Sequence, residues 1–283
     1  MERNIGLIGV GLLGRAIAER LLKHGFQVFA YDTNDDAEMP PHENVVICKS
    51  NVEVAQQANT IILCLPDSPV VRHVVEELQP HLNQHTIIDT TTGSLANTLA
   101  TSEQLAATGT KYLDSTVAGS SQQMRDGTAV LLIGAAEVAF TECKPVFDAL
   151  SSSCNHVGPV GSGSRMKLVV NLAIGLNRAV LAEALAFGES FGFDASQVVD
   201  ILRSTPAHSD QMDTKGPKMA TRDFQPQARL RQHHKDVKLI LESASELGAT
   251  VPLSQLHESI LQQLVTEGFG DEDNSVVIHA FRK

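Results

Sequence analysis

The sequence predicts a doubly wound α/β domain followed by an all-α domain, joined to it by a long interdomain helix. Apolar strand-like runs alternate with helix-like stretches over the first half of the chain, which is typical of a parallel sheet covered by helices on both faces. A Gly/Pro/Ser-rich segment near residue 161 ends this alternation, and strand patterns largely disappear after it. We therefore expect domains at residues 1–162 and 163–283.

Length and composition limit the possible classes of protein. A chain of 283 residues with 42% hydrophobic residues is long enough for about two domains with sizeable cores. Its net charge of −11 argues against a nucleic-acid partner and against an anionic membrane surface, because both would repel it. The four scattered cysteines form no C-x-x-C pair, so we expect no metal site and a cytoplasmic location. We also expect no signal peptide and no apolar stretch able to span a bilayer.

Strand-like and helix-like segments follow one another in order through the first domain. The strand-like runs are continuously apolar, as buried parallel strands are. We expect strands at 5–8, 27–31, 60–65, 86–89, 111–113 and 129–133. We expect helices at 12–24, 52–57, 70–78, 95–107 and 137–150. The polar segment 34–44 is predicted to be a loop.

The second domain is predicted to consist of helices. The stretch 164–191 is apolar nearly all round, which indicates a long helix buried among others. Asp194, with Gln197 three residues later, is placed to cap the next helix. Further helices fit 231–246 and 252–266, and the acids of "DEDNSVV" are placed to cap a last short helix. Because a small helical domain could not cover the long apolar helix alone, we expect a homodimer or homotetramer.

A glycine-rich loop lies between the first expected strand and the first expected helix. The segment "GVGLLG" has the spacing G-x-G-x-x-G, in which the first glycine permits a tight turn, the second lets the backbone approach a pyrophosphate and the third allows close helix–strand packing. Asp32 follows at the end of the second expected strand, where a carboxylate can accept both ribose hydroxyls. The pattern predicts a Rossmann-type dinucleotide site, the alternative being a plain glycine turn with an exposed aspartate. The residues expected to contact the dinucleotide here are Gly9, Gly11, Leu12, Leu13, Gly14 and Asp32.

The surroundings of Asp32 favour NAD over NADP. A 2′-phosphate needs a nearby cation, but the segment "YDTNDD" contains no Lys or Arg. Asp35 and Asp36 would add repulsion. We therefore predict NAD as the cofactor, with NADP less favoured.

A lysine and an asparagine lie one helical turn apart after the glycine-rich junction. The segment "GSGSRMKLVVN" puts Lys167 and Asn171 on one helix face, and Gly175 would keep that face open for a ligand. A lysine in an apolar helix either snorkels to water or is held dry for chemistry. Oxidation of a hydroxy acid needs such a base, because the cofactor takes the hydride and a protein group must take the hydroxyl proton. Burial and a neighbouring cation such as Lys235 would lower the pKa of a lysine toward this role.

Taken together, these motifs resemble those of the β-hydroxyacid dehydrogenases, the family that includes 3-hydroxyisobutyrate dehydrogenase and tartronate semialdehyde reductase. The resemblance covers essentially the whole chain in order. The family's opening glycine loop is similar to "GLIGVGLLG", its L-P segment to "CLPDSPVVRHVV" and its D-x-S-T motif to "DTTTGS". Its D-A-P-V-S-G-G and G-T-L motifs resemble "DSTVAGSSQQMRDGTAVLLIG", its G-x-G-x-x-x-K-x-x-x-N motif resembles "GSGSRMKLVVN", and its K-D-L segment resembles "HHKDVKL".

The resemblance implies an NAD(P)-dependent oxidoreductase that interconverts a small 3-hydroxy acid and its semialdehyde or keto acid. It implies that Lys167 is the general acid/base and that Asn171 holds the substrate oxygen. The positions that would contact the cofactor beyond the glycine loop are Leu65, Pro66, Thr92 and Lys235. From its position beside Lys235, Asp236 is expected to orient that lysine or to cap a contact rather than to take part in the chemistry.

One departure concerns the loop that would hold the substrate carboxylate. Where the family has S-G-G, this chain has Ala118, Gly119 and Ser120, and Thr116 stands in place of proline. The family's serine hydroxyl is absent, while Ser120 and Ser121 offer hydroxyls further along. We expect these four loop residues, from 118 to 121, to bind the substrate, and the identity of the acid stays open.

Two alternatives also stay open. A semialdehyde or imine reductase would share the scaffold, although imine reductases generally lack a lysine at the position of Lys167. A non-catalytic dinucleotide-binding protein would keep the glycine loop and would not need the pair of Lys167 and Asn171. His233 and His234 precede Lys235 and either shape the substrate pocket or lie on the surface.

Overall fold

The computed structural model describes residues 3–34, 37 and 39–282, and the chain divides into two compact units, residues 1–167 and 168–283. In the described part of the first unit, eight strands form one sheet in the order β3-β2-β1-β4-β5-β6-β7-β8. The pairs are parallel except β6 with β7, which is antiparallel. The doubly wound α/β prediction is confirmed, and the sheet is parallel apart from this one pair.

The expected strands are present, and two further strands extend the sheet at its edges. The short β3 and the polar β8 lack the continuous apolar pattern on which the prediction depended, and β6 is longer than expected. The strands are β1 (Asn4–Ile8), β2 (Gln27–Tyr31), β3 (Val45–Ile47), β4 (Thr60–Leu63), β5 (Thr86–Asp89), β6 (Lys111–Ala118), β7 (Val130–Gly134) and β8 (Ser153–Gly158).

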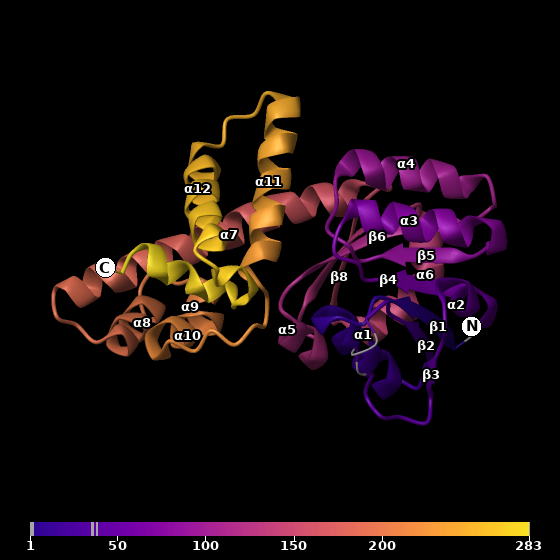
Figure 1. The fold of residues 1–283 in the computed structure, drawn as a ribbon, viewed down its shortest axis with the longest axis horizontal. Helices are drawn as coiled ribbons and strands as arrows, with labels where there is room; N and C mark the ends of the chain where they lie inside the picture. Colours follow the sequence, from indigo (N-terminus) through magenta and orange to yellow (C-terminus); the bar gives the residue numbers. More distant parts are fainter. Residues whose placement is uncertain (1–2, 35–36, 38, 283) are drawn as a thin grey trace. The chain divides into compact units, whose positions relative to one another are not determined.

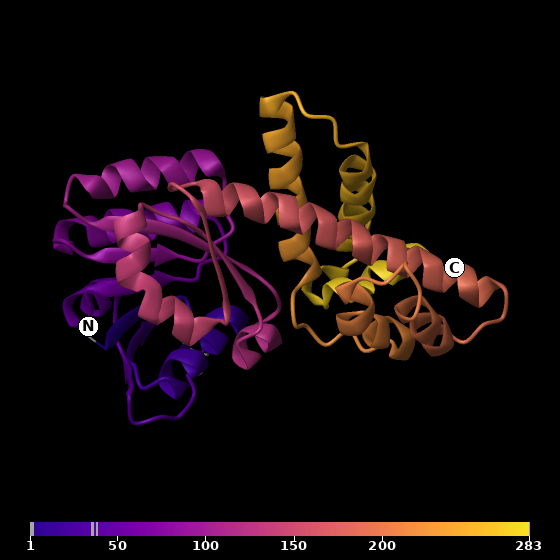
Figure 2. The same cartoon turned by 180° about the vertical axis from the view of Figure 1, so that it is seen from behind.

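Helices cover both faces of this sheet (Figures 1 and 2). One face carries α1 (Leu12–Lys23), α5 (Ser121–Asp126) and α6 (Glu137–Leu150), whose apolar side chains pack with the sheet into one core. The other face carries α2 (Asn51–Gln57), α3 (Ser68–Leu78) and α4 (Leu95–Ala106), which form a second core. The sequence did not predict α5, which is short and polar.

The strand β6 reaches further than its parallel neighbour β5. The two strands pair as far as Asp89 with Asp114, and β6 then continues to Ala118 along the antiparallel β7. At ~3.3 Å per residue, this extension carries the end of β6 about 13 Å beyond the end of β5. Because β1, β4, β5 and β6 run in the same direction, the loops after them lie at one edge of the sheet, where open α/β sheets bind ligands.

The long helix α7 (Ser162–Ser190) starts in the first unit and continues into the second. It matches the expected helix 164–191 closely. By length and composition α7 could cross a membrane, which corrects the expectation that no stretch of the chain qualifies. Part of its apolar surface is used inside the second unit, because Leu181, Ala182 and Leu185 belong to the core of that unit.

The second unit is helical, as predicted. Besides α7 it contains α8 (Ala195–Arg203), α9 (Asp210–Thr214), α10 (Gly216–Thr221), α11 (Leu230–Leu247) and α12 (Pro252–Thr266). Asp194 caps α8 by accepting hydrogen bonds from the amides of Ser196 and Gln197, at 2.9 and 3.2 Å. Asp273 caps the last helical segment, Asn274–Ala280, which is a 3₁₀ helix. The short helices α9 and α10 were not predicted.

Candidate active site

The three glycines of the loop after β1 have the geometry that their spacing predicts. Gly9 has a φ of +96°, and a Cβ there would collide with the carbonyl oxygen of Cys64. A Cβ on Gly14 would collide with the carbonyl oxygen of Gly9, so α1 packs tightly on the loop. A Cβ on Gly11 would meet nothing within 4 Å. The loop is therefore closed on the protein side and open at the position that would face a pyrophosphate.

Asp32 links the end of β2 to the glycine loop. Its Oδ2 accepts a hydrogen bond from the amide of Val10 at 2.6 Å, and its Oδ1 accepts one from the amide of Asn34 at 2.8 Å. Each carboxylate oxygen has a further lone pair, so this orientation is compatible with two ribose hydroxyl donors. Asp35 and Asp36, on which part of the cofactor argument depends, lie outside the described residues.

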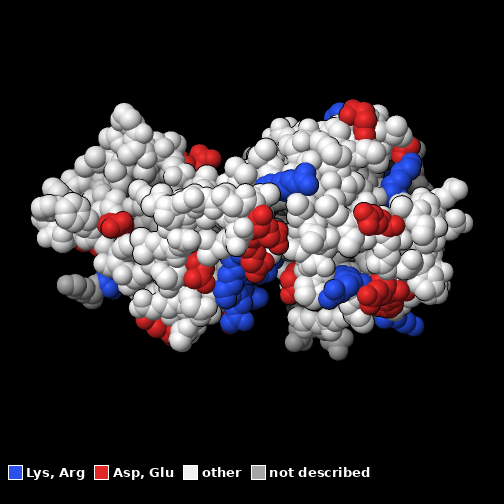
Figure 3. Space-filling model, turned by 90° about the horizontal axis from the view of Figure 1, so that it is seen from above, with Lys and Arg blue, Asp and Glu red and all other residues white. Residues whose placement is uncertain are grey.

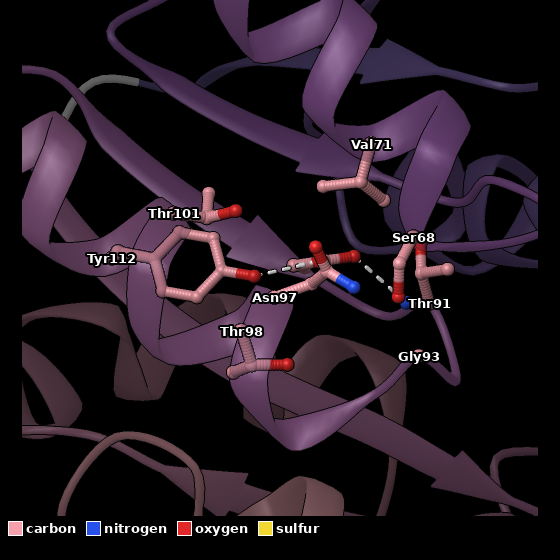
Figure 4. Close-up of a pocket in the computed structure, with 9 residues that line it drawn as sticks. Ser68, Val71, Thr91, Gly93, Asn97, Thr98, Thr101 and Tyr112 are labelled. Atoms are coloured by element: carbon pink, nitrogen blue, oxygen red, sulfur yellow. Dashed lines mark hydrogen bonds between the residues drawn. The ribbon is translucent and has the colours of Figure 1, made fainter. Parts of the chain in front are cut away.

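A buried polar network joins the ends of β4 and β5 (Figure 4). Tyr112 Oη donates to Asp89 Oδ2 at 2.7 Å, and the amide of Thr91 donates to Asp89 Oδ1 at 2.8 Å. Thr91 Oγ1 in turn accepts from the amide of Leu65 at 3.2 Å. Burial and the adjacent Asp89 carboxylate raise the pKa of Tyr112, so its hydroxyl stays a proton donor.

This network holds the two segments that carry Leu65, Pro66 and Thr92. A small polar cavity lies beside it, lined among others by Ser68, Asn97 and Thr98 (Figure 4). Asp89 belongs to the segment "DTTTGS", but neither it nor Tyr112 was predicted to have a function. No local pattern could have paired them, because they come from neighbouring strands.

The loop after β6 is shaped by a capping box. Gly119, with a φ of +153°, leads from Ala118 to Ser120, which caps α5. Ser120 Oγ accepts from the amide of Gln123 at 3.2 Å, while Gln123 Oε1 accepts from the amide of Ser120 at 2.8 Å. Ser121 is buried at the start of α5. Gln123 was not predicted to contribute, although the S-x-x-Q spacing signals such a box.

Asp114 and Thr116 on β6 bind the first turn of α7. The Asp114 carboxylate accepts from the amides of Gly161 and Ser164, both at 2.7 Å, and from Ser164 Oγ at 3.0 Å. Thr116 Oγ1 donates to the carbonyl oxygen of Gly163 at 3.2 Å, which gives the threonine at this position a structural use. Burial raises the pKa of Asp114, and the hydrogen bonds to its carboxylate oppose that shift.

Lys167 follows Ser164 by three residues, so both lie on the same face of the first turns of α7. The lysine is only 7% exposed to solvent. A snorkelling lysine would place its ammonium group in water, and such low exposure argues against that interpretation. The helix start that carries Lys167 is thus bonded to the strand that leads into the Ala118–Ser121 loop.

Asn171 and Lys235 lie in the second unit and share a partner. Asn171 Nδ2 donates to Asp236 Oδ2 at 2.9 Å, and Lys235 Nζ lies 3.4 Å from Asp236 Oδ1. Asn171 and Asp236 are both buried. The expected contact between Asp236 and Lys235 is present, and the contact with Asn171 is an addition that the sequence did not reveal.

The expectation that Gly175 keeps the helix face open is wrong. A Cβ at Gly175 would lie 2.6 Å from His233 Nε2 and 2.8 Å from His257 Cε1. The missing side chain therefore makes room for two imidazole rings. His233 and His234 are both buried, and His234 Nε2 lies 2.9 Å from Glu258 Oε1, so the surface alternative for these histidines does not hold.

Potential metal ligands and surface charges were compared over the part of the chain that the structure describes. Within residues 3–34, 37 and 39–282, no group of three or more His, Cys, Asp or Glu side chains could hold a metal ion. On the face drawn in Figure 3, Lys and Arg side chains are interspersed with Asp and Glu.

Family models match nearly the whole chain. Residues 4–158 match the NAD binding domain of 6-phosphogluconate dehydrogenase, and residues 161–281 match the NAD-binding domain described for NADP-dependent 3-hydroxyisobutyrate dehydrogenase. The chain belongs to the 3-hydroxyisobutyrate dehydrogenase-like β-hydroxyacid dehydrogenase family. Members are NAD(P)-binding oxidoreductases, and the order of the motifs in this chain agrees with that membership.

Curated relatives of this chain carry names that state different substrates or roles. 2-(Hydroxymethyl)glutarate dehydrogenase of Eubacterium barkeri is 30% identical, over 100% of this chain and 97% of its own length. 2-Hydroxy-3-oxopropionate reductase of Escherichia coli is 27% identical, over 98% and 96%. The cytokine-like nuclear factor N-PAC of Drosophila melanogaster is 26% identical, over 98% of this chain and 47% of its own length. Among solved structures, a 3-hydroxyisobutyrate dehydrogenase of Salmonella typhimurium has the same fold, with a TM-score of 0.88, 24% identity and coverage of 98% and 99%.

Proposed function

We propose that this protein interconverts a small 3-hydroxy acid and its semialdehyde or keto acid, with Lys167 as the general acid/base. The observation that carries the proposal is the burial of Lys167 at the start of a helix that Asp114 and Thr116 bind to β6. A lysine that is removed from water in this way is suited to exchange a proton with a bound substrate rather than with solvent.

The described loops fit a dinucleotide, which supplies the hydride acceptor or donor when it is bound. Gly11 leaves room for its pyrophosphate, and Asp32 can accept hydrogen bonds from its ribose. Leu65, Pro66 and Thr92 flank the same edge of the sheet, and the network of Asp89 and Tyr112 fixes their positions. An acidic ribose-binding residue favours NAD over NADP.

In oxidation, neutral Lys167 accepts the proton of the substrate hydroxyl group as the hydride leaves the carbon that carries this group. In reduction, the Lys167 ammonium group protonates the oxygen that gains negative charge. Asn171 holds that oxygen in line through its carboxamide, and its contact with Asp236 fixes the direction of the amide. Residues 118–121 would bind the substrate carboxylate, and Lys235 would contact the nicotinamide of the bound dinucleotide.

A substrate panel tests this function. The panel contains 3-hydroxyisobutyrate, 2-(hydroxymethyl)glutarate, 2-hydroxy-3-oxopropionate, glyoxylate and succinic semialdehyde, because relatives carry names based on these compounds. Each compound is incubated with NAD or NADH in the appropriate direction, and the change in NADH absorbance is followed. Turnover of at least one 3-hydroxy acid or its semialdehyde is expected. Binding of NADH without turnover of any panel member would favour the non-catalytic alternative.

A further inference from the structure

The capping box of α5 determines which hydrogen-bond donors the substrate loop can present. Its two members are Ser120, inside the loop, and Gln123, one turn into the helix. The side chain of each binds the backbone amide of the other, at 3.2 and 2.8 Å. The loop is thus coupled to a residue that lies outside it.

The backbone amide of Ser120 is already engaged. It donates to Gln123 Oε1 at 2.8 Å, a distance typical of a well-formed hydrogen bond. A backbone amide has one hydrogen to donate. A substrate carboxylate could use this amide only by displacing the Gln123 carboxamide.

The hydroxyl of Ser120 is oriented by the same box. Its oxygen accepts from the amide of Gln123, and a hydroxyl that accepts in this way keeps its own hydrogen to donate. Ala118, at the start of the loop, has no hydroxyl at all. The loop therefore offers a hydroxyl donor at Ser120 in place of that residue's backbone amide.

We infer that Gln123 is a positioning residue, which makes Ser120 bind a substrate carboxylate oxygen through its hydroxyl instead of its amide. The inference rests on the proposed function, because it takes residues 118–121 as the substrate loop. Gln123 acts through Ser120. The ligand class is a small 3-hydroxy acid with one carboxylate oxygen held by this hydroxyl.

Two variants and their combination separate this role from simple helix capping. Ser120→Ala removes the hydroxyl and keeps the amide bound to Gln123, so the KM for the acid rises by ~10-fold or more, the usual value of a hydrogen bond to a charged group. Gln123→Ala, which releases the Ser120 amide and keeps the hydroxyl, is the reference for the double variant. In the double variant the released amide of residue 120 takes over from the lost hydroxyl, and the KM returns toward that of the wild type.

The readouts are the KM for the best acid of the panel, the KM for NAD and the melting temperature, all measured on the full-length protein. The KM for NAD stays constant, and Gln122→Ala, which changes the neighbouring glutamine, is the matched control. Turnover by the wild type tests the proposed function separately. Where no panel acid is turned over, the Kd of 3-hydroxyisobutyrate for the NAD-loaded protein is measured by calorimetry instead. The Kd values of the variants are then compared with that of the wild type in place of the KM values.

The double variant shows whether Gln123 positions Ser120 for acid binding or only caps α5. Recovery of acid binding relative to Ser120→Ala alone supports the assignment, even if both variants lower the melting temperature. A double variant with a KM or Kd equal to or above that of Ser120→Ala would overturn it, as would a Ser120→Ala variant with unchanged acid binding.

Discussion

Asp114 on β6 accepts hydrogen bonds from both the amide and the hydroxyl of Ser164, at 2.7 and 3.0 Å, and so binds the first turn of α7 to the sheet. Lys167 lies three residues further along the same helix. The carboxylate is 2% exposed, so water competes little for these bonds. The position of the proposed acid/base therefore depends on a residue that lies on the strand before the substrate loop.

Replacing Asp114 by asparagine should impair turnover more than cofactor binding. The amide group can accept from one backbone amide but presents N–H groups to the other, so the start of α7 shifts. We expect kcat to fall by ~10-fold or more, because small displacements of catalytic groups are costly, with the KM for NAD unchanged. Steady-state kinetics test this, with Asp148→Asn on the exposed face of α6 as the control. An unchanged kcat would show that Asp114 does not position Lys167.

The cofactor preference tests the role of Asp32. Wild-type protein should have a higher kcat/KM for NAD than for NADP. A variant with Asp32→Ser and Thr33→Arg should shift the ratio of the two values toward NADP by ~10-fold or more, equivalent to about 1.4 kcal/mol. Thr33→Arg alone keeps the carboxylate bound to the Val10 amide and should shift the ratio less. A wild-type preference for NADP would contradict the assignment.

Much of the fold was predictable because buried parallel strands have continuous apolar sequences. The central strands β1, β2 and β5 were located to within one residue, and the glycine spacing correctly indicated the turn between β1 and α1. The edge strands β3 and β8 were not, because one is very short and the other is polar. The antiparallel pairing of β6 with β7 was not predicted, since β7 is as apolar and as buried as the parallel strands of the sheet.

The candidate site was predictable only where its chemistry lies in a local motif. Lys167, Asn171 and Asp32 belong to short spacings that can be recognised in one sequence. Contacts such as that of Asp114 with Ser164 join residues about fifty positions apart, and no periodicity reports them. Gly175 was misinterpreted for the same reason, since the histidines that fill its space come from other helices.

Acid should destabilise the protein through His257. This buried histidine has its pKa lowered to about 4, first by burial and then by the positive charges of Arg178 and His234. Below about pH 6.5 the unfolded chain binds a proton that native His257 does not bind until about pH 4. The free energy of unfolding should therefore fall as the pH is lowered through this window, by up to about 1.4 kcal/mol per pH unit.

Urea unfolding of wild type and of His257→Gln between pH 7 and 4.5 measures this contribution. The variant should lose less stability across the window than wild type, although it is less stable at pH 7. His81→Gln, at an exposed position, should retain the wild-type dependence. The same pH dependence in wild type and His257→Gln would exclude this residue as its source.

The apolar surface of the second unit predicts self-association. Val169, Val180 and Phe187 on α7 and Phe191 just after it are each more than half exposed, an arrangement that favours an interface. Sedimentation velocity at micromolar concentration should show a homodimer or homotetramer. Val180→Glu with Phe187→Glu should yield monomer, whereas Val138→Glu, at an equally exposed position on α6, should not. A monomeric wild type would refute the proposal.

The proposed role of Lys167 is to exchange the substrate proton, and the pH profile of the Lys167→Ala variant is the most direct test of that role. The role predicts that kcat falls by ~10²–10⁴-fold, the usual contribution of a positioned proton-transfer group, while NAD affinity changes little. It also predicts that the rising limb of the oxidation profile, which reports deprotonation of the lysine, disappears. Lys167→Arg should restore little, because a guanidinium hardly deprotonates. A Lys167→Ala variant within tenfold of wild type, with the rising limb intact, would contradict this role.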